Sequence, residues 1–355
     1  MIPAPPSRRV VVASALALAA CRGQAQTPPT PVTLAPLKSV APFPVGAAIS
    51  VGGLEDPNYR AVLLANFSQV TADWEMKMEQ ILLPDGTFSF AKADYIAAFA
   101  RINGLRLHGH NLIWYIYSPA PFERLAGDKA AFEKAYANYI LAVAGRYHGQ
   151  AVGWDVVNEP VAEDGDGYRP CLWRQVLGLD YVATALKYAR QADPGAVLFL
   201  NEYNLESKPK KRATFLRLVE DLMKQGAPLD GLGTQTHLSA DLAPGAIKTA
   251  VRELAATGLK IHVSEFDVTL QDHPLMSREA KLNAQARLAG EAGEALAALP
   301  AAQRYGFTTW GVRDQDSWLR HAPNAGDGTD APLLFDDDGH PKAAAAAFER
   351  AVGRS

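Results

Sequence analysis

The sequence predicts one (β/α)8 barrel, the TIM-barrel fold of the α/β class. Three observations carry this prediction: short apolar runs alternate with stretches of helical periodicity, the alternation continues along most of the chain, and polar side chains gather at the carboxyl ends of the runs. The chain has 355 residues, of which 48% are hydrophobic and 21% are charged. We expect one domain over residues 41–355, because no linker, low-complexity tract or long charge run divides that part of the sequence.

Eight β-branched or apolar runs are the candidate barrel strands. In chain order they are Val45–Ile49, Phe67–Thr71, Leu105–His110, Val152–Asn158, Val197–Asn201, Gly231–Gln235, Lys260–Glu265 and Tyr305–Trp310. Their lengths suit strands that are buried on both faces, which read as continuous apolar segments. A barrel of parallel strands is therefore expected.

Stretches with helical periodicity lie between the runs. They include Ala93–Ile102, Ala130–Tyr147, Tyr181–Ala192, Ala213–Gln225, Ala246–Ala256 and Ala280–Leu299, with a closing helix near Ala343–Val352. Asp193-Pro194-Gly195 and Thr257-Gly258 supply helix stop signals just before two of the runs. An open doubly wound sheet is the competing fold, but Val51-Gly52-Gly53 lacks the spacing of its phosphate-binding loop.

Residues 1–40 predict an export signal and a short linker. Arg8-Arg9 precede the apolar run Val10–Ala20, which is shorter than the roughly 18 apolar residues of a membrane span. Leu18-Ala19-Ala20-Cys21 resembles the lipobox of bacterial lipoproteins, whose cysteine is lipidated. A plain cleaved signal with an incidental Cys21 is the alternative. We expect an exported protein that is periplasmic, anchored to the membrane by lipid through Cys21, or secreted.

Charge and composition narrow the classes of partner. The formal net charge is −3 and the basic residues form no stripe, which argues against nucleic acid as a partner. Asp164-Gly165-Asp166-Gly167 lacks the later acidic ligand of a calcium loop, and His108, His110 and His237 occur without an HExxH zinc pattern. We therefore expect no metal and no cofactor. We also expect the protein to be a monomer.

Two glutamates are the most informative residues. Glu159 closes the segment Trp154–Pro160, and Glu265 lies in Ile261–Asp267. A carboxylate at the end of a buried strand is costly to desolvate, and two of them suggest the paired carboxylates of glycoside hydrolysis. A buried salt bridge from either glutamate to Lys77 or an arginine is the structural alternative.

Other polar and aromatic residues also fall at or beyond the run ends, where TIM barrels build their active sites. With the two glutamates they form the candidate site: Lys77, His110, Trp114, Asn158, Tyr203, Gln235, His237, Asp267, Trp310 and Trp318. Indole faces can bury the C–H faces of pyranose rings, while lysine, histidine and asparagine side chains hydrogen-bond the hydroxyls. The set therefore suits a carbohydrate chain.

Local spacing suggests how these residues cooperate. Gln235 and His237 lie two residues apart, as do Glu265 and Asp267, so each pair can share one face of its strand. Asp267 can then orient His237, and His237 can donate to Glu265 and keep the pKa of that carboxyl low. By contrast, strict alternation sends Asn158 and Glu159 to opposite faces unless the strand twists or bulges. Pro160 favours an extended conformation for Glu159.

The chain resembles glycoside hydrolase family 10, the barrel xylanases, from about Phe43 to Phe348. The matching segments, all in the family's order, are Val70-Thr71, Met76-Lys77, Gly109–Trp114, Trp154–Glu159, Asn201–Asn204, Gly231–Leu238, Ser264–Asp267, Trp310–Asp314, Ser317-Trp318 and Pro332–Phe335. The resemblance implies an endo-1,4-β-xylanase that acts on β-1,4-xylan or xylo-oligosaccharides with retention of configuration. It implies that Glu159 is the acid/base, that Glu265 is the nucleophile, and that Asn158 holds the 2-hydroxyl of the sugar being cleaved.

Four residues depart from the family pattern. Asp73-Trp74 replaces the usual Glu-Asn pair, Met78 replaces a tryptophan, and Tyr115 stands where a second histidine is common. The Glu-Asn pair ordinarily binds the sugar one unit beyond the cleaved residue, so the distal glycone subsite is expected to differ. A related β-glycan hydrolase that selects decorated xylan or short xylo-oligosaccharides is therefore one alternative, and a non-catalytic surface glycan-binding protein is another.

Overall fold

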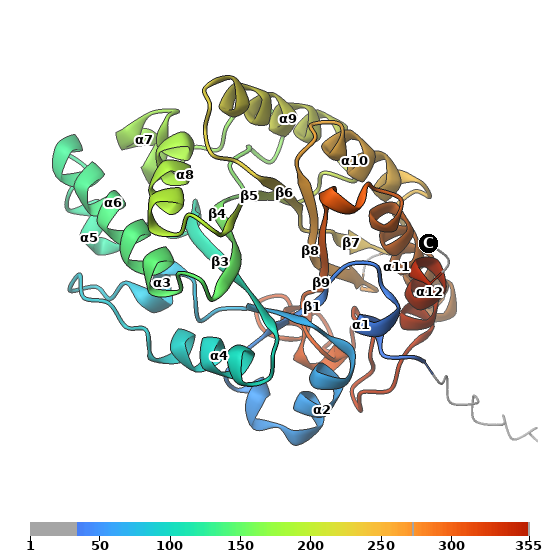
Figure 1. Cartoon of the computed structure of the whole chain (residues 1–355). Coiled ribbons are helices and arrows are strands. Elements are labelled where there is room, and N and C mark those ends of the chain that lie inside the picture. Colours follow the sequence, from blue (N-terminus) through green and yellow to red (C-terminus); the bar gives the residue numbers. More distant parts are fainter. Residues whose placement is uncertain (1–33, 272, 354–355) are drawn as a thin grey trace, which may run out of the picture. The chain divides into compact units, whose positions relative to one another are not determined.

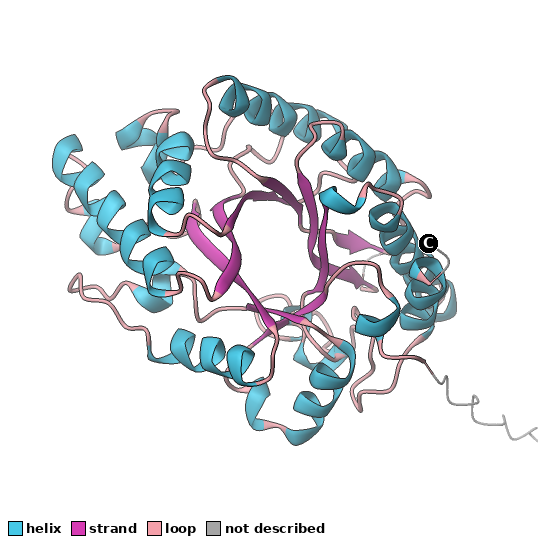
Figure 2. Cartoon of the chain, in the orientation of Figure 1, coloured by secondary structure: helices cyan, strands magenta, loops and turns pink. Residues whose placement is uncertain are grey.

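The computed structural model describes residues 34–271 and 273–353. The predicted export signal, including Cys21, lies outside these residues. Within them the (β/α)8 prediction is confirmed: Figure 2 shows an inner ring of strands surrounded by an outer ring of helices. In the described part of the chain, no helix is both long enough and apolar enough to cross a membrane.

Parallel strands form the closed barrel (Figure 1). They are β1 (Val45–Ile49), β2 (Gln69–Ala72), β3 (Arg106–Trp114), β4 (Ala151–Asn158), β5 (Val197–Glu202), β6 (Gly231–Thr234), β8 (Lys260–Thr269) and β9 (Arg304–Thr309). Neighbours in this series pair in parallel, and pairing of β9 with β1 closes the ring. A short strand, β7 (His237–Ser239), pairs with the outer end of β8 and brings His237 beside Asp267.

Helices surround the barrel. They are α1 (Leu37–Val40), α2 (Pro57–Asn66), α3 (Met78–Ile81), α4 (Ala91–Ile102), α5 (Ala120–Glu123), α6 (Lys129–Arg146), α7 (Leu172–Leu177), α8 (Tyr181–Ala192), α9 (Pro209–Lys224), α10 (Ala246–Ala255), α11 (Arg278–Ala297) and α12 (Ala343–Val352). The seven predicted helices are all present, with bounds that agree to within a few residues. Helix α2 was not predicted, although Asp56 caps it and Pro57 occupies its first turn.

The core lies inside the barrel and between the strands and the helices. Trp154 on β4 is fully buried, and its ring packs so closely on Gly109 of β3 that a Cβ there would lie 2.2 Å from it. Only glycine fits at that position. Trp173, on α7, is buried against Phe122, and its indole nitrogen donates to the carbonyl of Trp114 (2.8 Å). It therefore supports the strand end that carries Trp114.

Residues 34–40 also take part in the folded unit. Leu37, in α1, is fully buried and belongs to the hydrophobic core. The backbone nitrogen of Ala35 donates to the carboxylate of Glu349 on α12 (2.9 Å). The start of the described chain is thus tied to its last helix.

Candidate active site

A cavity of about 700 Å3 opens at the carboxyl ends of the barrel strands. Every expected catalytic and substrate-contacting residue lines it: Lys77, His110, Trp114, Asn158, Glu159, Tyr203, Gln235, His237, Glu265, Trp310 and Trp318. Asp267 lies behind the wall, in contact with His237 and Trp318. Residues from seven of the barrel strands, or from the loops that follow them, thus meet in one cavity.

Glu159 adopts a conformation that its sequence does not favour. Its φ is 57°, in the left-handed region, so the extended conformation expected from Pro160 is wrong. The register of β4 against β5 also shifts between Asp155 and Val157. Together these features bring Asn158 and Glu159 to the same side of the strand end, where the Asn158 amide nitrogen donates to Glu159 Oε1 (3.1 Å).

Asparagine and glutamine side chains link the two carboxylates. Glu159 Oε1 also accepts from the Gln235 amide nitrogen (2.9 Å), and Glu265 Oε1 accepts from the Asn201 amide nitrogen (2.6 Å). The same nitrogen of Asn201 donates to Asn158 Oδ1 (2.9 Å). A continuous set of hydrogen bonds therefore runs from one glutamate to the other.

Asn201 is a site residue that the sequence interpretation left out of the candidate set. Ser264 Oγ donates to Asn201 Oδ1 (2.7 Å), which orients the amide so that its NH2 group faces Asn158 and Glu265. Its position at the end of a predicted strand was a usable signal. The bridging role was not readable, because Asn201 is distant in sequence from both of its partners.

Neither of the two glutamates forms a salt bridge with a lysine or an arginine in the described part of the chain. Among residues 34–271 and 273–353, no lysine or arginine lies within ion-pair distance of either carboxylate. The ammonium group of Lys77 lies instead among three indole rings, 4.8 Å from Trp74, 5.1 Å from Trp114 and 5.6 Å from Trp310. The structure therefore does not contain the buried lysine or arginine salt bridge that was the structural alternative.

His237 supplies the cation next to Glu265. Its Nε2 lies 3.2 Å from Glu265 Oε2, and its Nδ1 lies 2.9 Å from Asp267 Oδ2. Burial alone would lower the pKa of His237, but Asp267 and Glu265 outweigh burial and raise it to about 10. Burial alone would raise the pKa of Glu265, yet the charges of His110, His237 and Lys77 lower it overall. Glu265 is thus held ionised.

Asp155 is a second buried carboxylate that orients a histidine of the site. Its Oδ2 lies 2.8 Å from His110 Nδ1 and 3.1 Å from His108 Nε2. Burial opposes ionisation, but the two histidines hold the pKa of Asp155 well below its usual value. His110 in turn packs edge-on against Trp310, with ring centroids 5.1 Å apart. Asp155 therefore orients a residue of the cavity wall without reaching the cavity itself.

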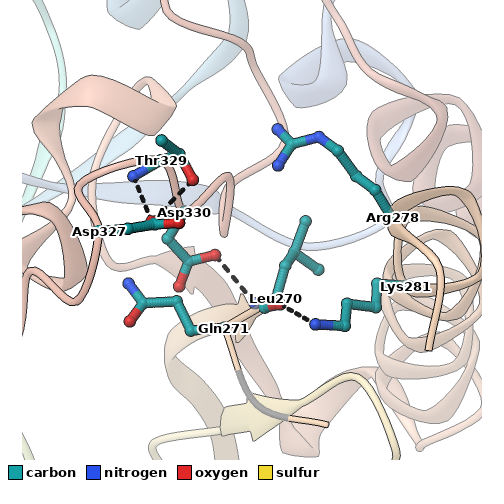
Figure 3. A pocket seen from close by; sticks show the side chains of 7 residues that line it. All are labelled: Leu270, Gln271, Arg278, Lys281, Asp327, Thr329 and Asp330. Atoms are coloured by element: carbon teal, nitrogen blue, oxygen red, sulfur yellow. Dashed lines mark hydrogen bonds between the residues drawn. The ribbon is translucent and has the colours of Figure 1, made fainter. Parts of the chain in front are cut away.

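The loop that carries Trp318 is held by residues that follow β8. Gln271 donates to the carbonyls of Leu319 (3.3 Å) and Ala325 (3.2 Å), and Asp330 accepts from the backbone nitrogen of Leu270 (2.9 Å). Figure 3 shows these side chains around a separate hollow of about 360 Å3, which is lined by Leu270, Gln271, Arg278, Lys281, Asp327, Thr329 and Asp330. Several polar groups of this hollow thus hold the loop in place.

Three of the four departures from the family pattern, Asp73, Trp74 and Tyr115, line the cavity, whereas Met78 is buried at the start of α3. Trp74 lines the cavity with 46% of its surface exposed, and Asp73 also borders a second hollow of about 370 Å3. Asp316 and His321 also line both spaces, so the second hollow adjoins the cavity. Near Glu159, Tyr115 packs against the guanidinium group of Arg169, 4.0 Å from the ring centroid.

Known proteins with similar sequences share this architecture. The model of glycosyl hydrolase family 10 matches residues 37–351. The beta-1,4-xylanase of Dictyoglomus thermophilum is 34% identical over 310 residues, which cover 85% of this chain and 86% of that protein. The endo-1,4-beta-xylanase A of Cellvibrio japonicus is 33% identical over 340 residues, which cover 87% of this chain.

The chain spans about half the length of two curated relatives, 55% of the Cellvibrio enzyme and 45% of an endo-1,4-beta-xylanase A from a Caldicellulosiruptor species. A structure of a thermostable xylanase mutant from Cellvibrio japonicus superposes with a TM-score of 0.81 and 31% identity, covering 90% of this chain and all of that one. On the length of the family match and the identity to these relatives, the chain belongs to glycosyl hydrolase family 10.

Proposed function

We propose that the protein is an endo-1,4-β-xylanase that hydrolyses xylan with retention of configuration. The observation that carries the proposal is the unequal pair of carboxylates in one cavity: Glu265 is held ionised by His237, whereas the Glu159 carboxylate accepts from the uncharged amide groups of Asn158 and Gln235. A retaining glycosidase needs this inequality, because one carboxylate attacks while the other carboxyl group donates a proton.

In the first step, an oxygen of Glu265 attacks the anomeric carbon as the bond to the leaving oxygen breaks. Glu159 gives its proton to that oxygen, and a covalent glycosyl-enzyme forms. In the second step, Glu159 takes a proton from water, the water oxygen attacks the anomeric carbon, and Glu265 leaves. Asn201 and His237 donate to Glu265 in the resting site and hold it in one orientation for attack.

The remaining cavity residues position the sugar chain. Trp114, Trp310 and Trp318 present indole surfaces for pyranose rings, while Lys77 and His110 offer donors to hydroxyl groups. Asn158 holds the 2-hydroxyl of the cleaved sugar, and Tyr203 and Gln235 complete the wall around the bond. Incubation with a panel of β-glycans tests the proposal: short xylo-oligosaccharides from xylan would support it. Xylan binding without release of reducing sugar would instead favour a glycan-binding protein.

His237→Asn is expected to shift the pH dependence of the reaction. The charge of His237 helps to hold the pKa of Glu265 below its ordinary value, so its removal should raise that pKa. The nucleophile would then become protonated at a higher pH. The acidic limb of the plot of kcat/KM against pH should therefore shift to higher pH. His148→Asn, at an exposed histidine outside the cavity, is the matched control and should leave the limb in place. An unchanged limb in His237→Asn would contradict this role.

Trp74 offers different contacts to a sugar at the distal glycone end from those of the Glu-Asn pair usual in the family. An asparagine can bond a sugar hydroxyl, whereas the exposed indole of Trp74 offers an apolar face and one N–H donor. We propose that plain xylan is bound less tightly at this end and that decorated xylan or short xylo-oligosaccharides are alternative substrates. Binding energy remote from the reacting bond is what long substrates use to raise turnover.

Trp74→Asn combined with Asp73→Glu is therefore expected to improve cleavage of unsubstituted xylo-oligosaccharides. The gain in kcat/KM should correspond to about 1 to 2 kcal/mol, the scale of one or two regained hydrogen bonds. The measurement compares kcat/KM for oligosaccharides of increasing length in the wild type and the double variant. If the double variant loses activity on all plain oligosaccharides while the wild type cleaves them efficiently, Trp74 is itself an adapted platform.

We also propose that the protein is exported and carries a lipid on Cys21. Support comes from the sequence alone, through Leu18-Ala19-Ala20-Cys21. Cys21→Ser should move the protein from the membrane fraction to the soluble exported fraction without changing its specific activity. Fractionation and mass analysis of the mature amino terminus would check this. If the wild-type protein is soluble and its mature chain begins after Cys21, the proposed lipid anchor is wrong.

A further inference from the structure

Arg169 lies directly behind the cavity wall, on the side of Glu159. Only 8% of its surface is exposed, and it does not line the cavity. Its guanidinium group lies between two aromatic rings that do, 4.0 Å from the centroid of Tyr115 and 5.5 Å from that of Tyr203. A planar guanidinium group is well suited to stacking of this kind.

The hydrogen bonds of Arg169 are directed at the acid/base segment. Its Nε donates to the backbone carbonyl of Glu159 (3.0 Å), and one terminal nitrogen donates to the Tyr203 hydroxyl (3.0 Å). The backbone nitrogen of Arg169 donates to the carbonyl of Pro160 (2.7 Å). Residues 160–169 thus form a loop whose two ends are joined beside Glu159.

Glu159 needs such support because its backbone is strained. A non-glycine residue in the left-handed region is energetically unfavourable and persists only where its surroundings hold it. The peptide groups on both sides of Glu159 are held: its N–H donates to the Asn201 carbonyl (2.7 Å), and its carbonyl accepts from Arg169. Without the second bond, the backbone of Glu159 would lose one of the two hydrogen bonds that hold it in this conformation, and the direction of its side chain would be less well fixed.

We propose that Arg169 is a positioning residue for Glu159, which it holds in the left-handed conformation required for proton donation. The inference rests on the proposed function, in which Glu159 is the acid/base. Tyr115, which replaces a histidine usual in the family, and Tyr203 contribute to this positioning, because both rings contact the guanidinium group. Lys211 supports Tyr203 from behind, with its ammonium group 3.3 Å from the ring centroid.

The test uses substrates that differ in their need for an acid. Hydrolysis of xylohexaose requires protonation of a poor leaving group, whereas the first step on 2,4-dinitrophenyl β-xylobioside requires little. We expect Arg169→Met to lower kcat on xylohexaose by about 10- to 100-fold with little change in KM, the scale of a lost charge-assisted hydrogen bond. On the aryl glycoside, kcat/KM should stay within about threefold of wild type.

Arg174→Met is the matched control. Arg174 donates to the carbonyl of Tyr168 in the same loop, but within residues 34–271 and 273–353 it forms no hydrogen bond or ion pair with Glu159, Tyr115 or Tyr203. We expect both substrates to be cleaved at wild-type rates by this variant. Arg169→Lys keeps the charge but not the planar fork, and it should recover only part of the xylohexaose activity lost in Arg169→Met.

The outcomes separate this inference from the proposed function. Equal losses on both substrates in Arg169→Met and Arg169→Lys would overturn the inference and leave a general structural role, as would wild-type rates on both. Adding Arg169→Met to Glu159→Ala should cause no further loss on xylohexaose, because the residue that it positions is gone. If Glu159→Ala itself shows no dependence on the leaving group, the proposed function fails first.

Discussion

Glu265→Ala is expected to lower kcat on xylan by several orders of magnitude. The change removes the atom that attacks the anomeric carbon, and no other ionised side chain in the cavity shares the contacts of Glu265 with His237 and Asn201. Because the alanine leaves space below the anomeric carbon, azide should enter and restore part of the activity. The product should be a glycosyl azide of inverted configuration, since a single displacement then occurs.

The measurement combines kcat with NMR of the azide product. Glu220→Ala, which removes an exposed glutamate on α9 that is paired with Lys224, is the control for the loss of a carboxylate outside the site. That variant should retain wild-type activity. A Glu265→Ala protein that is folded and active without azide, or that gives a retained azide product, would contradict the assignment of the nucleophile.

Glu159→Ala is expected to give a loss that depends on the leaving group. Xylan and xylo-oligosaccharides should be cleaved orders of magnitude more slowly, because their leaving oxygen needs a proton. Aryl glycosides with good leaving groups should form the covalent intermediate at nearly the normal rate. The second step lacks its base, so azide should accelerate turnover and yield a product of retained configuration.

A series of aryl xylobiosides with leaving groups of increasing pKa measures this dependence. In Glu159→Ala the rate of the first step should fall steeply with leaving-group pKa, whereas in the wild type it should change little. Loss by the same factor on every substrate would show that Glu159 acts in some way other than proton donation. The same series provides the reference for Arg169.

Apolar runs were sufficient to place the barrel strands, because a strand that is buried on both faces must be apolar along its length. Periodicity likewise placed α8 and α12 at the bounds that the structure shows. It did not reveal α2, although Tyr59, Val62 and Leu63 follow helical spacing behind the capping residue Asp56, because the helix spans only ten residues. Short elements such as β7 depend on a neighbouring strand for their hydrogen bonds and carry almost no local pattern.

The candidate site could be predicted as a set of residues, because parallel strands of a barrel all end at one face. Glu159, Glu265 and His237 could therefore be assigned to one site from the sequence alone. Asn201, Asp155 and Arg169 could not be assigned roles in this way. Their functions consist of contacts with residues far away in the sequence, and hydrogen-bond geometry is not encoded in local spacing.

The sequence alone determined which elements form the barrel and which side chains end its strands, because both follow from burial and periodicity within short segments. The conformation of Glu159 was decided by the tertiary structure. Locally, Pro160 favours an extended backbone, but the Asn201 carbonyl and the Arg169 guanidinium group bind the two peptide groups of Glu159 and stabilise the left-handed conformation instead. The combined tertiary hydrogen bonds outweigh a local preference of about 1 to 3 kcal/mol, so the fold sets where the proton donor points.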